Sequence, residues 1–461
     1  MKVDKYFVFI LFIAILNGIN QTNTLYKYFV YLQIISVLFY SFKNIKKAFL
    51  LHIIFMITSN NFLLTSDDYG VIINYSKLKF IGNFSYSYLV LFFFCFIALL
   101  IGKNNRKINL KNKYIKKFYF SINFFCLYPI ILGVLGLTFN KYYNFFSFFN
   151  YSIYCLNLMI YFFIIISLYN RKDYQLLNNT LLTLIFVSCI HPFILKILNQ
   201  HGEYGGIKIW MSLDIVSFSV ILFFVKGFFS KFFLLIYILS FKFMASGKNI
   251  FFFIIAIYKL TTLNFSGKKK LILNIILILV FIIFLINKNS ILSIIASNKN
   301  NLFYYKIREI FSMIEFWNLK EMYSSPKIRV IEGIDIILNY LEKPLFSIFG
   351  FGFGGYYQDI SGLFKEVDLE MGAFSKEIIN SGIFPNAHVQ LLNIFLFNGF
   401  FGLIFIYKYC VLFWKNIKKY PLAIISFLWL FFIFYFNVHV MIFCLLSTYL
   451  FFIEYNEKNK I

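Results

Sequence analysis

Long apolar runs separated by short, lysine-rich connections extend along the chain, and this pattern limits its fold more than any other feature. A helix that crosses a bilayer needs about 20 mostly apolar residues. The sequence therefore predicts an all-α, polytopic membrane helix bundle with about 14 transmembrane helices, within a range of roughly 11 to 14. The segments are residues 6–19, 28–42, 48–64, 84–101, 118–139, 151–169, 176–198, 209–225, 232–246, 250–265, 271–287, 388–407, 421–437 and 439–453.

The composition excludes several other classes of protein. Hydrophobic residues make up 61% of the chain and charged residues 14%, against about 45–50% and 25% in soluble domains. A soluble enzyme, a secreted disulfide scaffold and a disordered chain are therefore excluded. The net charge of +25 does not indicate a nucleic-acid partner, because the lysines lie in short runs between apolar segments, next to membrane lipid. The six cysteines lie in apolar runs without ligand spacing, which predicts buried apolar residues and no metal site.

The distribution of Lys and Arg predicts the orientation in the membrane. Lysine-rich connections alternate with connections that hold few basic residues, and the richer set faces the cytoplasm by the positive-inside rule. Both termini then lie on the cytoplasmic side of the membrane. We divide the chain into an N-terminal transmembrane bundle of about 11 helices at residues 1–287, an extracytoplasmic loop domain at 288–385, and C-terminal transmembrane helices with a short cytoplasmic tail at 386–461.

The extracytoplasmic loop holds more than half of the chain's 19 acidic residues and is expected to be mostly helical. One amphipathic helix is predicted around residues 307–317. A second begins at Ser325-Pro326, a serine cap followed by proline at the first helical position, and ends before Pro344. Its apolar stripe is predicted at Ile331, Ile334, Leu338 and Leu341.

Two motifs follow this second helix. Glycines alternate in the sequence GFGFGG, residues 350–355, where Gly352 and Gly354 would let the backbone approach a ligand. The alternative is a tight turn that ties the loop to the membrane helices.

Further on, Asn386 is a candidate helix cap and His388 would lie in the first turn of a membrane helix at the outer surface. A helix N-terminus favours an anion, and histidine can act as a general base near neutral pH. The alternative for His388 is an interfacial residue in the lipid headgroups.

Two cations are candidates for binding phosphate. Arg329 lies early in the second loop helix, and its planar fork suits phosphate oxygens. The alternative is an exposed helix charge paired with Glu332 or Asp335, which would contribute little. Lys248, followed by Asn249, lies at an outer hairpin between apolar runs, where a snorkelling interfacial lysine is the alternative.

The order of these features resembles the O-antigen polymerase and O-antigen ligase superfamily over residues 240–405. That family has ten to fourteen membrane helices and one large outer loop near its C-terminal end. Two positions depart from the family pattern: Lys248 stands where an Arg is usual, after Ser246, and Gly333 stands where a Trp is usual. The matching positions are Arg329, Pro344, Gly350, Gly352, Gly354, His388, Leu391, Leu392, Gly399, Gly402 and Leu403.

The resemblance implies a membrane glycosyltransferase that polymerises repeat units of O-antigen (as in lipopolysaccharide), capsule or a similar surface polysaccharide. Its substrate would be an oligosaccharide on a polyprenyl diphosphate, with a flippase and a chain-length regulator as partners and no cofactor or metal. His388 and Arg329 would be catalytic. The substrate-binding residues would be Lys248, Asn249, Gly352, Gly354 and Asn386.

Two alternatives remain at this point. One is a ligase-type transferase of the same superfamily, and the other is a lipid-linked oligosaccharide flippase or other transporter. Flippases usually lack a large outer loop and have two similar halves, and this sequence has such a loop and no visible internal repeat.

Overall fold

A computed structural model gives the fold of the chain. It describes residues 26–59, 75, 78–81, 84–139, 143–197, 202–204, 207–209, 266–287, 290, 319, 322, 324–366, 376–414 and 438–458. The chain divides into two compact units, each considered by itself below. The first comprises Met1–Phe29, Thr58–Asn74 and Leu182–Tyr323, and the second comprises Val30–Ile57, Tyr75–Leu181 and Ser324–Ile461.

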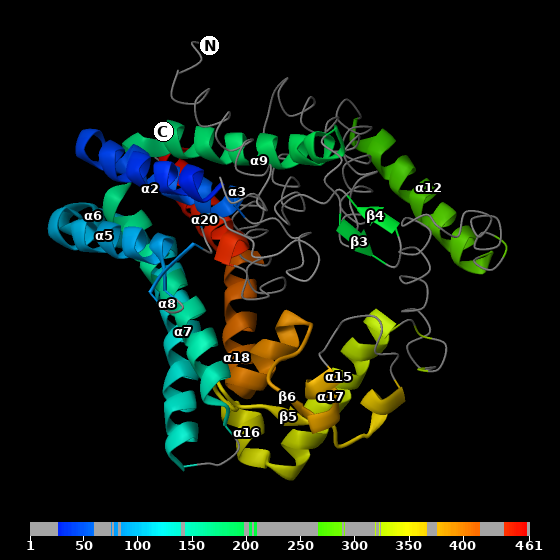
Figure 1. Ribbon diagram of the computed structural model, residues 1–461. Helices are drawn as coiled ribbons and strands as arrows, with labels where there is room; N and C mark the ends of the chain where they lie inside the picture. The colour runs from blue at the N-terminus through cyan, green and yellow to red at the C-terminus, as the bar shows by residue number, and fades with distance from the viewer. Residues whose placement is uncertain are drawn as a thin grey trace. The chain divides into compact units, whose positions relative to one another are not determined.

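Helices dominate the described residues (Figure 1). The α-helices are α2 (Tyr26–Lys43), α3 (Ile45–Thr58), α5 (Tyr86–Ile101), α6 (Lys103–Lys111), α7 (Lys113–Phe139), α8 (Phe145–Leu168), α9 (Tyr174–Ile197), α12 (Gly267–Ile286), α15 (Ser324–Glu342), α16 (Pro344–Phe349), α17 (Lys376–Ser381), α18 (Gln390–Trp414) and α20 (Val438–Lys458). Three two-stranded antiparallel sheets pair β1 (Lys79–Ile81) with β2 (Phe84–Ser85), β3 (Gly202–Tyr204) with β4 (Ile207–Ile209), and β5 (Tyr357–Gln358) with β6 (Ile383–Phe384).

Each predicted apolar segment that falls within the described residues coincides with a helix. Three helices there are long and apolar enough to cross a membrane: α7, α8 and the Gln390–Lys408 part of α18. A fourth span results if α5 and α6, which meet at an angle of 81°, are counted together. The described part of the chain is thus mostly helical, with three or four candidate spans. The predicted segments 6–19, 209–225, 232–246, 250–265 and 421–437 lie outside the described residues.

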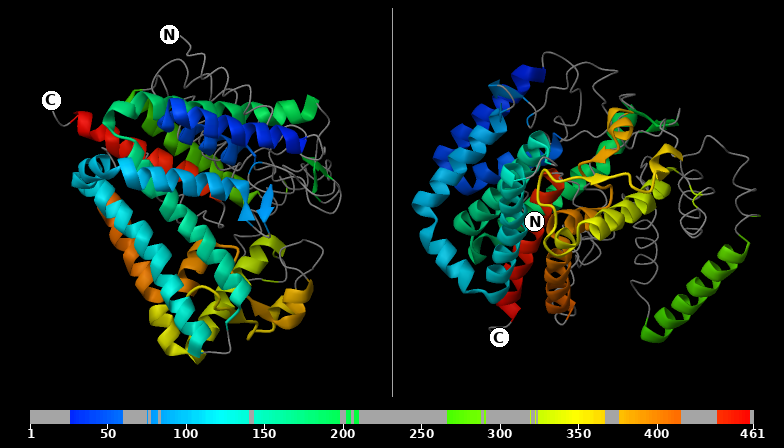
Figure 2. Two further views of the ribbon diagram at one scale, coloured as in Figure 1. Left: turned by 60° about the vertical axis from the view of Figure 1, so that its left-hand side comes forward. Right: turned by 90° about the horizontal axis from the view of Figure 1, so that it is seen from below.

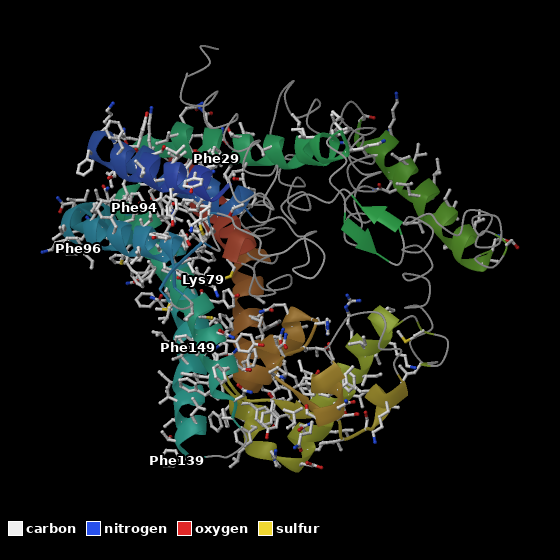
Figure 3. The ribbon with its side chains drawn as sticks, viewed as in Figure 1. Phe29, Lys79, Phe94, Phe96, Phe139 and Phe149 are labelled. Carbon is white, nitrogen blue, oxygen red and sulfur yellow. The ribbon has the colours of Figure 1, made fainter. Side chains whose placement is uncertain are left out.

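The surfaces of these helices suit contact with lipid. Phe139 at the end of α7 is 84% exposed, and Phe96 of α5 also projects outward (Figure 3). Phe94, two residues from Phe96, is instead fully buried against Phe49 of α3. The apolar residues of α5 therefore face both inward and outward, as expected of a helix in a membrane rather than in water.

The core of the second unit is built around α7 and α8. These helices lie side by side, joined by a short connection, and both further views show the pair (Figure 2). Helices α5 and α20 pack on α8, and α18 packs on α7. His52 of α3 lies in this core, where its Nδ1 and Nε2 atoms are 2.9 Å and 2.8 Å from the hydroxyls of Tyr75 and Tyr161.

The connections of this unit gather at the two ends of α8. At the C-terminal end, Asn105 and Asn109 of α6 donate hydrogen bonds to the last carbonyls of α8 and to Tyr169. Lys46, at the start of α3, forms a 2.6 Å ion pair with Asp173 at this end. At the N-terminal end, the backbone N–H of Asn144 donates to the carbonyl of Gly354. The connection before α8 therefore meets the glycine turn, whereas the start of α3 and helix α6 meet the connection after α8.

Helix α18 is broken at Gly399, whose dihedral angles are φ 57° and ψ −157°. A break of this kind leaves the preceding carbonyls without their partners in the helix. The carbonyls of Leu396 and Phe397 instead accept hydrogen bonds from Phe351 and Gly352, at 2.8 Å and 3.0 Å. Irregular backbone within a span is tolerated where such partners exist. A Cβ on Gly399 would lie 2.5 Å from the backbone nitrogen of Gly350, so the glycine allows this close approach, and the regular helix does not continue through it.

Helix α15 confirms the predicted second loop helix, with Ser324 as its first residue and Pro344 beginning the next helix. The predicted apolar stripe is only partly confirmed: Ile331 is fully buried, but Leu341 is exposed and Ile334 and Leu338 are only partly buried. The fully buried side chains include three polar ones, Glu332, Asp335 and Asn339. The predicted helix at 307–317 lies outside the described residues.

Candidate active site

His388 lies in an extended segment just before α18. The helix begins at Gln390, so the prediction that His388 occupies its first turn and that Asn386 caps it is wrong. The physical reason is a side chain of the helix itself. Asn393 accepts a hydrogen bond from the backbone N–H of Ala387 and donates one to its carbonyl, both at 2.7 Å. This pair holds the backbone beside His388 in a non-helical shape, and Asn386 lies partly buried in the same segment.

The carboxylate of Glu332 holds His388 at two points. Its oxygens accept the backbone N–H of His388 at 3.0 Å and 2.9 Å, and its Oε1 is 2.5 Å from the ring Nδ1. The side chain of Glu332 has no exposed surface, whereas that of His388 is 29% exposed. A buried carboxylate thus fixes one edge of the imidazole while the side chain as a whole remains accessible.

The other buried polar residues of α15 tie the helix to the segment after the glycine turn. Asp335 accepts a 2.8 Å hydrogen bond from the backbone N–H of Ser361. Asn339 donates to the carbonyl of Gln358 and accepts from its N–H, at 2.8 Å and 3.1 Å. The two carboxylates considered as partners of Arg329, those of Glu332 and Asp335, thus also contact His388 and Ser361. Arg329 itself is partly buried, one helical turn before Glu332.

The glycine turn owes its glycines to packing. Gly352 and Gly354 have φ angles of +72° and +84°, a region that residues with a Cβ rarely adopt. A Cβ on Gly352 would lie 2.6 Å from the backbone nitrogen of Gly133 in α7, and one on Gly354 would lie 2.8 Å from Phe148 Cβ in α8. The structure favours the alternative of a tight turn tying the loop to the membrane helices, because protein atoms fill the space a ligand would need there.

Burial also affects the ionisable groups beside His388. It raises the pKa of the Asp335 carboxyl above its ordinary value. It raises the pKa of the Tyr357 phenol well above its usual range, and the nearby carboxylates of Glu332, Asp335 and Asp359 add to this effect. Tyr357 therefore stays neutral at physiological pH. Within the part of the chain that the structure describes, no three His, Cys, Asp or Glu side chains form a group suited to a metal ion.

The sequence predicts roles for His388 and Arg329, whereas it indicates Glu332 only as a possible partner of Arg329. Nothing in the sequence marks Asn393. A buried acidic residue three positions after Arg329 has no local signal that distinguishes it from an exposed helix charge. Lys248 and Asn249, the other predicted substrate-binding residues, lie outside the described residues.

The arrangement brings together the elements of a proton-transfer site: an accessible imidazole, a buried carboxylate bound to one of its nitrogens, and an arginine on the same helix as the carboxylate. Comparison with family models, with curated proteins and with solved structures finds no match to this chain.

Proposed function

We propose that this chain is a membrane glycosyltransferase that polymerises lipid-linked oligosaccharide repeat units on the outer face of the bacterial plasma membrane. The observation that carries the proposal is the contact of His388 with the helix that bears Arg329. Arg329 and Glu332 are three residues apart, so their Cβ atoms lie about 5–6 Å apart on one helix face. A base and a cation that suits phosphate are thereby brought into one small region.

The reaction needs both groups. The hydroxyl oxygen of the acceptor sugar attacks the anomeric carbon of the donor, forming a new glycosidic bond as the bond to the diphosphate breaks. The diphosphate leaves with that electron pair, and Arg329 stabilises its developing charge. Nε2 of His388 accepts the hydroxyl proton, which then passes from the imidazolium to water. The products are a lipid-linked chain longer by one repeat unit and a free polyprenyl diphosphate.

The grouping of connections supports the proposed location of the site. The lysine pattern assigns the connections around Lys46, α6 and Asp173 to the cytoplasmic side, and these contact one another. The same pattern assigns the connection before α8 and the loop after residue 288 to the outer side, and Asn144 contacts Gly354. His388 belongs to the second group, on the side where the donor lipid is proposed to be presented.

The test uses purified full-length protein in lipid nanodiscs, given polyprenyl-diphosphate-linked repeat units. We expect a ladder of products on a gel, each longer by one repeat unit. The Arg329→Ala variant should lose the ladder. Lys365→Ala, which removes an exposed cation from the same outer segment, is the matched control and should retain it.

The same experiment separates the alternatives. A ligase would transfer the donor once to an added lipid acceptor and give a single product without a ladder. A flippase would form no glycosidic bond in the nanodiscs and would instead move labelled lipid between the leaflets of vesicles. Either result would contradict the proposal.

A further inference from the structure

Two hydrogen-bond donors of a single residue converge on the Glu332 carboxylate. One is the backbone N–H of His388, which can only donate, and the other is the ring nitrogen Nδ1. An ionised carboxylate can only accept, so the Nδ1 atom beside it must carry a hydrogen. A neutral imidazole has one N–H, and the remaining nitrogen, Nε2, then carries a lone pair instead of a hydrogen.

The environment of Glu332 makes this contact costly to lose. The side chain is completely buried, and a buried carboxylate without partners is strongly destabilising. Both of its oxygens contact His388. An amide at this position has one acceptor oxygen and one donor NH2, so it cannot face both donors of His388 without placing one N–H against another. Glutamine at position 332 therefore cannot reproduce the contacts that the glutamate makes with His388.

The other buried polar residues of α15 make a different kind of contact. Asp335 and Asn339 bind backbone groups of Ser361 and Gln358, and Asn339 also donates to the carbonyl of Asp335. Glu332 is the one of these three that contacts a titratable ring. Asn339 is as deeply buried as Glu332 and also ties α15 to the outer loop, so it provides a control for purely structural effects.

Among the described residues, other charged or titratable groups near the pair lie on α15, on β5 and just after β5. Arg329 and Asp335 lie on α15, and Tyr357 of β5 lies within electrostatic reach of Glu332, Asp335 and Asp359. Tyr357 stays neutral near pH 7, so its charge does not change where an imidazole ordinarily titrates. A change in tautomer or activity over that range therefore reports mainly on the histidine and its carboxylate neighbours.

We infer that Glu332 is a positioning residue, whose carboxylate holds His388 in the tautomer with hydrogen on Nδ1 and a lone pair on Nε2. What Nε2 does next rests on the proposed function, but the tautomer does not. In the transfer step the carboxylate also stabilises the imidazolium that forms when Nε2 takes the acceptor proton.

The first test is nuclear magnetic resonance of full-length protein labelled with 15N in its five histidines, reconstituted in nanodiscs. The His388 signals are those missing from the His388→Ala spectrum. In the neutral form of the ring, we expect a protonated Nδ1 and an unprotonated Nε2. Glu332→Gln should give a mixed or reversed tautomer, while Glu332→Asp, which keeps two acceptor oxygens, and Asn339→Ala should retain the wild-type tautomer. A hydrogen on Nε2 rather than Nδ1 in the wild-type protein would overturn the inference.

The second test is turnover in the extension assay. Replacing the carboxylate of a histidine–carboxylate pair by an amide can lower turnover by up to about 10⁴-fold. We expect Glu332→Gln to lower kcat at least 10-fold with little change in KM, and Glu332→Asp to recover part of the loss. Asn339→Ala should lower thermal stability with a much smaller effect on kcat per folded molecule.

The two tests keep the inference separate from the proposed function. Wild-type turnover and tautomer in Glu332→Gln, together with an inactive His388→Ala, would refute the role of Glu332 alone. Normal extension by His388→Ala would refute the proposed role of the histidine, while the tautomer measurement would still decide what Glu332 does to the ring. If Glu332→Gln does not fold, the wild-type spectrum decides the question without it.

Discussion

The Gly352→Ala substitution tests how closely the glycine turn packs against helix α7. Gly352 has a φ of +72°, and a residue with a Cβ loses about 1–2 kcal/mol in that region. The new Cβ would also lie 2.6 Å from Gly133 N and from Leu132 Cβ, so the helix backbone must move. Overpacking of this kind costs about 1–3 kcal/mol. We expect a total loss of about 2–5 kcal/mol, a large share of the roughly 5–15 kcal/mol typical of folded domains.

Gly362→Ala is the matched control. Gly362 has a nearly identical φ of +70°, but nothing lies within 4 Å of a Cβ built there. Its loss should be only the conformational part, about 1–2 kcal/mol. The difference between the two variants isolates the packing contribution.

Thermal unfolding in detergent can be followed with a thiol-reactive dye, because Cys126, Cys155 and Cys444 are buried and react only when the chain opens. Gly352→Ala should unfold at a clearly lower temperature than Gly362→Ala. Folded Gly352→Ala protein should keep its kcat, since the turn contacts helices rather than substrate. Equal unfolding temperatures for the two variants, or a specific rise in KM for Gly352→Ala, would refute this reasoning.

Three further predictions concern the outer segment and its surroundings. Arg329→Lys should restore little of the extension lost in Arg329→Ala, because an ammonium lacks the bidentate fork of a guanidinium. The gel ladder measures this. Full activity in either variant would show that Arg329 is only a surface charge. Burial raises the pKa of the Asp335 carboxyl, so the folded chain keeps this proton to higher pH than the unfolded chain and loses stability as the pH rises above about 4. Asp335→Asn should therefore gain stability relative to wild type as the pH rises, which thermal unfolding at several pH values measures. A stability difference that does not depend on pH would contradict this prediction. Single cysteines at positions 110 and 365 should react with impermeant reagents from the cytoplasmic and outer sides respectively, and labelling of both from one side would overturn the orientation.

Helix positions in this chain follow from local signals. Apolar runs mark the membrane helices, and the Ser325-Pro326 pair and Pro344 mark the limits of α15. These signals work because they depend on residues within a few positions of one another. Local rules nevertheless misplace the start of α18, because the side chain of Asn393 holds Ala387 out of the helix.

The buried face of α15 shows what local signals leave out. An apolar stripe rule selects Ile331, Ile334, Leu338 and Leu341, of which only Ile331 is fully buried. The face that is buried carries Glu332, which is stable there because it meets His388, 56 positions further along the chain. The break at Gly399 is similar, since its freed carbonyls are satisfied by Phe351 and Gly352. Such partners become visible only when distant segments are placed together.

The most direct test of the account is the rate at which His388→Ala extends polyprenyl-diphosphate-linked repeat units. A general base contributes about 10²–10⁴-fold in rate, so we expect His388→Ala to leave single repeat units unextended or to extend them more slowly by that factor. His388→Gln, which keeps a hydrogen bond but cannot take the proton, should be nearly as defective. The measurement is the product-length distribution over time at several pH values, for variants with wild-type protein levels and unfolding temperatures. A normal ladder from His388→Ala would remove the histidine from the mechanism and leave it an interfacial residue.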